Sequence, residues 1–225
     1  MIKNGLVEQV YGIIKDKIIN LELNLGQRID IQKIAAELGI SQTPVREALN
    51  RLAKDRLISI NPRKGYYVTD ISPEDMEEIY DIRRIFEVYA LDSAIENIDL
   101  YKLKKLKQKM EEELRGRITR KKRKTKFEID KQLHLLIVNS SKNKKLKEMY
   151  YEIYDFIKIF QRMNPGFKET LEEHIALIDT IIKKDTEEAK KLLAVHIENA
   201  KGRIIKVFKN MKGENKQNKS TSKPI

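Results

Sequence analysis

The stretch from Lys33 to Leu52, KIAAELGISQTPVREALNRL, constrains the fold more than any other part of the chain. Apolar residues recur at helical spacing on both sides of Gly39, which predicts two short amphipathic helices joined by a tight turn. Gly39 suits the turn because helices commonly end at a residue with positive φ. Ser41 is suited to cap the second helix, and Pro44 fits its first turn, where a missing N–H does no harm. The pattern is that of a helix-turn-helix.

The segments around this motif predict a winged-helix domain over residues 1–70. An amphipathic helix is expected over 6–19. Downstream, the chain becomes β-prone towards residue 60, turns through NPRKG at 61–65 and enters a second strand at 66–68, which predicts a two-stranded wing with a basic tip. An ordinary helical hairpin with a solvated polar face is the alternative, and the predicted wing argues against it.

Composition limits the compartment and the class of partner. The chain has 225 residues and no Cys, which excludes a disulfide framework and a thiolate metal site. It carries no signal-peptide pattern and no membrane-length apolar run, so we expect a cytoplasmic protein without a membrane partner. The net charge of +12 favours nucleic acid as a partner, but residues 1–70 contribute only +3 of it. Eight basic residues lie in 115–126, which we interpret as a solvated helix end and loop, with auxiliary DNA contact as the alternative.

The remainder of the chain predicts a second, all-helical domain over 74–211, joined by a linker at 71–73. Its length suffices for an antiparallel bundle with its own core, so the fold class is mostly α. The polar tail, residues 212–225, is expected to be disordered. Six helices are predicted in this domain, at 74–96, 100–115, 126–140, 144–163, 167–183 and 186–211.

All three histidines of the chain lie in these predicted helices. His134 follows Asp130 by one helical turn, so the two side chains share a face. His174 and His196 occupy the last two helices, where antiparallel packing can bring them to the same depth. Three imidazoles and one carboxylate suit a divalent metal such as Zn²⁺, Ni²⁺ or Mn²⁺, with a position left for water or ligand. For each histidine taken alone, a core or surface position without a metal is the alternative.

Longer motifs resemble a known family. The stretch from Leu6, LVEQVYGIIKDKIINLELNLGQRIDIQKIAAELGISQTPVREALNRLAKDRLI, resembles the N-terminal domain of the GntR family of bacterial transcription regulators. IYDIRRIFEVYALDSAI, EIDKQLHLLIVNSSKNKKL and EEHIALIDTIIKKDTEEAKKLLAVHI resemble the FCD domain of its FadR subfamily, in the six-helix VanR-like branch. The basic 115–126 stretch departs from that pattern. The family's metal ligands map onto Asp130, His134, His174 and His196.

The resemblance implies a homodimer that presents two winged helices to a palindromic DNA operator. Arg46 matches a DNA-contacting Arg of the family, whereas Gln42 stands where relatives often carry Arg. Because Gln prefers adenine and Arg prefers guanine, we predict an operator that leans towards A·T pairs. The candidate DNA-binding residues are Gln32, Ser41, Gln42, Thr43, Arg46, Arg51, Lys64 and Gly65.

The resemblance also implies control by a small carboxylate effector. Arg83 is the expected anchor for the carboxylate, with Tyr80 and Arg84 as weaker candidates; a salt bridge from Arg83 to Glu87 is the alternative. The leading hypothesis is a dimeric, metal-containing repressor that responds to the effector. The rivals are a metal-dependent enzyme acting on a small organic acid, against which no general base or nucleophile accompanies the metal motif, and a metal-only sensor or architectural DNA-binding protein.

Overall fold

A computed structural model describes residues 2–116, 120–166 and 168–220, and the side chains of residues 5–116, 127–166 and 168–210. The chain divides into two compact units, with the boundary between Ser72 and Pro73, inside the predicted linker. Nine helices and two strands form within the described residues, and the mostly α fold class is confirmed.

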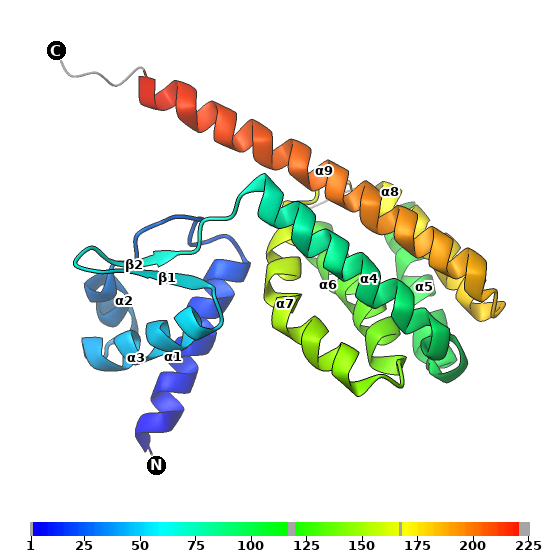
Figure 1. Ribbon diagram of the computed structural model, residues 1–225, viewed down its shortest axis with the longest axis horizontal. Coiled ribbons are helices and arrows are strands. Elements are labelled where there is room, and N and C mark those ends of the chain that lie inside the picture. The colour runs from blue at the N-terminus through cyan, green and yellow to red at the C-terminus, as the bar shows by residue number, and fades with distance from the viewer. Residues whose placement is uncertain (1, 117–119, 167, 221–225) are drawn as a thin grey trace. The chain divides into compact units, whose positions relative to one another are not determined.

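The first unit is a helical domain with a two-stranded wing (Figure 1). Helix α3 packs against α1 and α2, and this packing completely buries its apolar stripe, which includes Val45 and Leu49. The spacing of this stripe is the one that the sequence predicted. The elements are α1 (Ile2–Ile19), α2 (Ile31–Leu38), α3 (Gln42–Lys54), β1 (Ile58–Asn61) and β2 (Gly65–Val68).

The turn between α2 and α3 follows from its residues. Gly39 ends α2 with a φ of 65°, the left-handed conformation that the sequence predicted for it. Asp30 caps the start of α2 by accepting a hydrogen bond from the Lys33 N–H at 3.0 Å. Ser41 occupies the N-cap of α3, as expected, but its side chain makes no capping hydrogen bond.

The wing is an antiparallel pair in which Ile58 faces Val68 and Asn61 faces Gly65. Residues 26–29 run along the free edge of β2, where the Ile29 N–H donates to the Tyr66 carbonyl at 2.8 Å. This third segment ties the wing to the chain that leads into α2.

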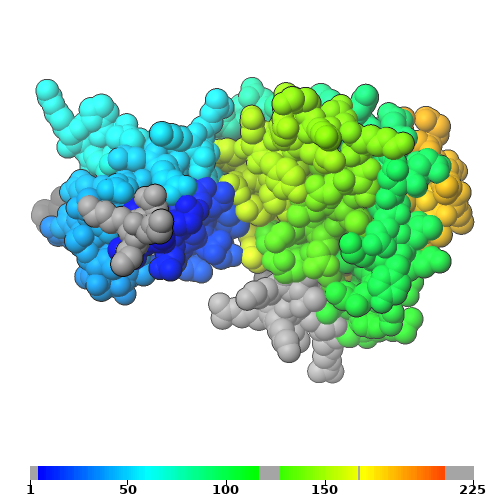
Figure 2. All heavy atoms as spheres, turned by 90° about the horizontal axis from the view of Figure 1, so that it is seen from below, coloured from blue at the N-terminus to red at the C-terminus, as the bar shows by residue number. Residues whose placement is uncertain are grey.

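The second unit is a bundle of six helices, the number that the sequence predicted. Helix α4 packs against α6, α7 and α9, while α5 packs against α6 and α8. Figure 1 shows α9 running beside α4, and Figure 2 shows side chains near 130–160 packed closely beside those near 90–115. All six helices contribute buried side chains to the interior of the bundle. The elements are α4 (Pro73–Asn97), α5 (Leu100–Arg115), α6 (Arg120–Ser140), α7 (Lys144–Met163), α8 (Lys168–Ile182) and α9 (Thr186–Ser220).

Two predicted boundaries are wrong. Helix α6 begins at Arg120 rather than near residue 126, so part of the basic 115–126 stretch is helical rather than loop. Helix α9 continues to Ser220, past its predicted end at residue 211. Lys, Glu and Gln are good helix formers, and no Pro follows before Pro224, so the backbone can continue the helix across this polar stretch. Residues 117–119 and 221–225 lie outside the described residues.

None of the helices in the described part of the chain has the length and apolar character needed to cross a membrane.

Candidate metal centre and DNA-binding surface

The bundle brings the four predicted metal ligands to one point. Asp130 and His134 lie one turn apart on α6, His174 lies on α8 and His196 on α9. All four are buried, and each offers one ligand atom within 4.8 Å of the other three.

The distances between these atoms suit a shared cation. The Nε2 atom of His174 lies 3.3 Å from Nε2 of His134 and 3.0 Å from Nε2 of His196. Two imidazole nitrogens bound to one zinc ion, at about 2.0–2.1 Å each, are separated by about 2.9–3.4 Å for bond angles of about 90–109°. Asp130 Oδ1 lies 3.5 Å from the same His174 atom. The donor set therefore fits a divalent metal.

Two carboxylates set the tautomers of these histidines. Glu87 Oε2 lies 2.5 Å from Nδ1 of His134, and Glu173 Oε2 lies 2.6 Å from Nδ1 of His196. A carboxylate accepts hydrogen bonds, so each Nδ1 carries the proton and each Nε2 presents a lone pair. Burial also lowers the pKa of His196, which favours the neutral ring. If Nε2 of His174 carried a proton, that N–H could donate to the lone pair of His134 or of His196 but not to both. A bound cation could accept the lone pairs of all three imidazoles.

Glu87 is held in its ionised form at the centre of the bundle. Its Oε1 atom accepts from Arg83 Nε at 2.8 Å and from the Tyr150 hydroxyl at 2.7 Å. Burial raises the pKa of Glu87, but the Arg83 guanidinium and His134 lower it further, so the pKa lies well below its usual range. For Glu173, burial likewise raises the pKa, and hydrogen bonds from His196 and Arg203 bring it down to about 2.

The predicted effector residues separate into two groups. Arg83 is 1 % exposed and forms the salt bridge with Glu87, yet its Nη2 atom has no partner among the described residues. The Tyr80 hydroxyl is also buried and makes no hydrogen bond of normal geometry with the described residues, although Arg83 interacts with it; burial raises the pKa of Tyr80 to about 12. Arg84, in contrast, is exposed and lines a surface groove with Ile85 and Tyr89. Its place on the outer face of α4 separates it from the buried cluster.

Two residues of α7 complete this buried polar region and were missed by sequence reasoning. Gln161 donates from Nε2 to Asp130 Oδ2, while its Oε1 has no partner among the described residues. The Tyr154 hydroxyl likewise has no hydrogen-bond partner among the described residues, and burial raises its pKa, with the Asp130 charge raising it further and the Arg83 charge lowering it. Tyr154 is buried and Gln161 is partly buried on α7, and nothing in their spacing distinguishes them from ordinary core-facing residues.

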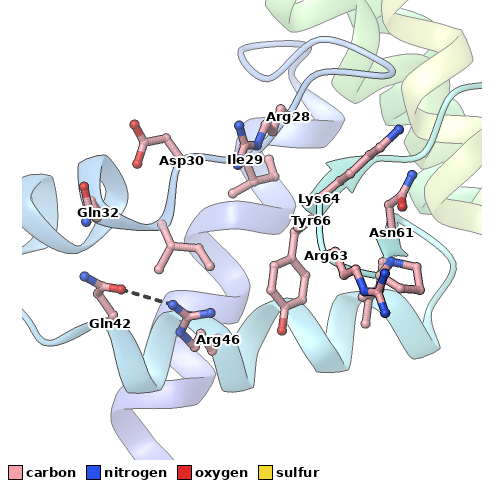
Figure 3. Close-up of a pocket in the computed structure, with 14 residues that line it drawn as sticks. Arg28, Ile29, Asp30, Gln32, Gln42, Arg46, Asn61, Arg63, Lys64 and Tyr66 are labelled. Carbon is pink, nitrogen blue, oxygen red and sulfur yellow. Dashed lines mark hydrogen bonds between the residues drawn. The ribbon is translucent and has the colours of Figure 1, made fainter.

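The first unit carries a groove of about 760 Å³ between the start of α2, the start of α3 and the wing. Figure 3 shows Gln32, Gln42 and Arg46 on the helical side of this groove, with Lys64 on the wing. Arg46 Nη2 donates to Gln42 Oε1 at 3.3 Å, so these two candidates are held together. Gly65 also lines the groove, so five of the eight predicted DNA-binding residues meet there.

Sequence reasoning missed two arginines in the groove. Arg28 enters from the segment that runs along β2, and Arg63 stands in the wing turn with a φ of 66°. The only sequence signal for Arg63 was the basic wing tip, and Arg28 carried none. The Tyr66 hydroxyl donates to Asn50 Oδ1 at 2.8 Å and joins the wing to α3.

The other three predicted DNA-binding residues lie outside the groove. Arg51 is placed against α1, where it pairs with Glu8 at 2.8 Å and lies over the Tyr11 ring. Its intramolecular partners separate it from the groove. Ser41 and Thr43 are exposed at the start of α3 and are not among the residues that line the groove.

Comparison with known proteins agrees with both units. Residues 6–68 match the model of the bacterial regulatory proteins of the gntR family, and residues 78–199 match the FCD domain. The chain is 30% identical over 192 residues to the HTH-type transcriptional regulator YdhC of Bacillus subtilis, covering 84% of this chain and 86% of that protein.

Solved structures share the fold. The Escherichia coli McbR/YncC structure superposes with a TM-score of 0.72 at 24% identity, over 90% of this chain and 98% of that one. The Zn²⁺-bound FCD domain of TM0439 gives a TM-score of 0.53 at 24% identity, over 60% of this chain and 95% of that domain.

The family and the relatives are transcription regulators rather than enzymes, which argues against the alternative of a metal-dependent enzyme. The chain belongs to the GntR family of bacterial regulatory proteins, as a transcription regulator with a DNA-binding helix-turn-helix domain and an FCD effector-binding domain.

Proposed function

We propose that this regulator is a homodimeric repressor whose affinity for its operator is controlled by a small carboxylate effector bound at a divalent metal in the FCD domain. The observation that carries the proposal is the convergence of four buried ligand atoms beside an Arg83 guanidinium that retains an unpaired Nη2. Zinc in the FCD domain of TM0439 supports Zn²⁺ as the first metal to test.

The unpaired atoms around Asp130 favour a particular effector chemistry. A carboxylate would occupy an open metal position and accept a hydrogen bond from Arg83 Nη2, a charge-assisted contact. The hydroxyls of Tyr80 and Tyr154 are further donors, while Gln161 Oε1 is an acceptor. An acid that also carries a hydroxyl would satisfy both kinds of group, so a small hydroxy acid is the effector class that we propose.

Dimerisation would use the exposed apolar face of the bundle. Ile82, Ile85 and Tyr89 follow one another at helical spacing on α4 and are 38%, 61% and 56% exposed. Val195 of the neighbouring α9 is 50% exposed. A second copy would cover these side chains, and a two-fold dimer presents two winged helices to the two halves of a palindrome.

DNA contact would centre on the groove of the first unit. Of its charged lining residues, Arg28, Arg46, Arg63 and Lys64 are basic and Asp30 is acidic, which suits a phosphate backbone. Gln42 at the start of α3 would read adenine, so we propose an operator that leans towards A·T pairs. Ser41 and Thr43 would contact phosphates beside the groove.

The test is operator binding as a function of metal and acid. An operator is selected from random duplexes, and its affinity is measured by fluorescence anisotropy with the metal-free protein, with Zn²⁺, and with Zn²⁺ plus hydroxy acids. We expect the matching acid to weaken DNA binding at least about tenfold, a coupling of about 1.4 kcal/mol.

Matched variants locate the effect. Arg83→Lys should lose the response to acid while it still binds Zn²⁺, and Arg84→Lys, one residue away on the exposed face, should retain the response. A protein that bound no specific duplex at moderate salt would refute the regulator as proposed. A response to Zn²⁺ alone, with no acid effect, would instead identify a metal sensor.

A further inference from the structure

The two carboxylates that face the metal-ligand histidines have different surroundings. Glu87, the partner of His134, is completely buried among groups of the bundle core. Glu173, the partner of His196, is 21% exposed and is contacted by several groups of α9. The second carboxylate therefore lies at the rim of the site, where the packing of α8 and α9 controls it.

Among the described residues, the side chains that hydrogen-bond Glu173 come from one face of α9. Arg203 donates to both carboxylate oxygens of Glu173, with Nη1 at 3.1 Å from Oε1 and Nη2 at 3.2 Å from Oε2. Asn199 Nδ2 donates to Oε1 at 2.9 Å. These residues follow His196 by three and seven positions, so all three side chains share a face of the helix. A bidentate guanidinium fixes the plane of the carboxylate, and the carboxylate in turn fixes the imidazole.

The turn between α7 and α8 packs directly against this guanidinium. A Cβ atom on Gly166 would lie 2.8 Å from Cδ and 2.9 Å from Nε of Arg203, so only glycine fits without displacing the side chain. Arg203 Nη2 also lies 3.5 Å from the Thr170 hydroxyl, which donates to the Gly166 carbonyl. A continuous series of contacts thus joins Gly166 to Arg203, Glu173 and His196.

We propose that Glu173 is a positioning residue of the metal centre, and that Arg203 makes metal affinity depend on the packing of the turn at Gly166. This inference rests on the metal site of the proposed function. Glu173 holds the His196 proton on Nδ1 and directs Nε2 at the ion. Carboxylate partners of this kind orient the ring and increase its basicity, and their loss typically costs about 10–100-fold in metal affinity. The turn at Gly166 thereby becomes a point from which packing can tune the site.

The direct test is the Zn²⁺ affinity of the full-length protein, measured by competition with a chromophoric chelator. Glu173→Met should bind Zn²⁺ about 10–100-fold more weakly, and Glu173→Gln, which keeps an acceptor, should recover part of the loss. Glu172→Met is the matched control, since Glu172 is exposed and pairs only with Lys168 among the described residues. Wild-type affinity in Glu173→Met, or an equal loss in the control, would overturn the proposal.

Two further measurements keep the outcomes distinct. The ¹⁵N shifts of the His196 side chain in metal-free protein should show protonation on Nδ1 in wild type and a tautomer mixture in Glu173→Met; unchanged shifts would contradict the positioning role. Gly166→Ala changes no residue of the site and should weaken Zn²⁺ several-fold by moving Arg203, whereas unchanged affinity would exclude the link to the turn. If wild type bound no Zn²⁺, the proposed metal function would fail, while the tautomer measurement would still decide the role of Glu173.

Discussion

Arg83 and Glu87 form an ion pair at the centre of the bundle, with side chains only 1% and 0% exposed. The pair also belongs to a larger set of contacts, because Glu87 accepts hydrogen bonds from His134 and Tyr150. Replacing Arg83 by Met leaves the Glu87 charge buried with two remaining donors. Replacing Glu87 by Met leaves the Arg83 charge buried and removes the acceptor of both other donors.

The structure therefore predicts unequal losses. Breaking a buried ion pair from one side costs about 3–5 kcal/mol, and we expect Arg83→Met at the lower end of that range. Glu87→Met should cost at least about 5 kcal/mol, because each buried donor left unsatisfied adds about 1–3 kcal/mol. The double variant should cost less than the sum of the two, since neither charge then remains unpaired.

The assay is urea unfolding of the metal-free protein, followed by circular dichroism at 222 nm. Arg84→Met is the control and should change the free energy of unfolding by less than about 0.5 kcal/mol, because Arg84 is exposed. A loss below about 1 kcal/mol for Arg83→Met, or additive losses in the double variant, would refute the view that this pair is a coupled structural element. Arg83 would then serve the effector alone.

Four other results are expected. Gln42→Arg should shift the operator selected from random DNA towards G·C at the contacted position, and an unchanged preference would remove Gln42 from base recognition. Ile85→Lys should convert the proposed dimer into a monomer in sedimentation analysis, with an unchanged circular dichroism spectrum. Zn²⁺ at about 1,000 times its Kd should stabilise the protein by about 4 kcal/mol in thermal unfolding, and His174→Ala should abolish this gain. Zn²⁺ affinity should fall with acidification, because protons compete with the metal for imidazole nitrogens; burial lowers the pKa of His196 below about 6.5, so protonation of this ligand sets in below that pH, and a flat profile between about pH 5 and 7 would contradict imidazole ligation.

Much of the fold could be predicted because the responsible signals are local. Apolar spacing and the left-handed Gly39 define the helix-turn-helix, and both concern residues within a few positions of one another. The four candidate metal ligands could be selected for a similar reason, since Asp130 and His134 share one helix face and histidine is rare in this chain. The end of α9 was predicted wrongly, because polar composition indicates solvation but does not by itself prevent a helix.

The partners of those ligands could not be predicted in the same way. Glu173 adjoins His174 in sequence but contacts His196 on another helix, and Arg28 lines the proposed DNA-binding groove from a segment outside the predicted helices and strands. Neither relation has a sequence period, since each depends on how separate elements are placed. The sequence spacing of His196, Asn199 and Arg203, which places them on one face of α9, was the signal that could have indicated their shared contact with Glu173.

The sequence by itself determined the number of helices and their approximate positions, the bend of the helix-turn-helix and the candidate metal ligands, because these depend on local periodicity and on the chemistry of single residues. Only the tertiary structure decided which nitrogen of His134 and His196 faces the site, because carboxylates from other helices set the tautomers. It also decided that Arg83 lies inside the bundle while its neighbour Arg84 faces solvent. Consecutive residues on a helix point about 100° apart, so only the packing of α4 among its neighbours distinguishes them.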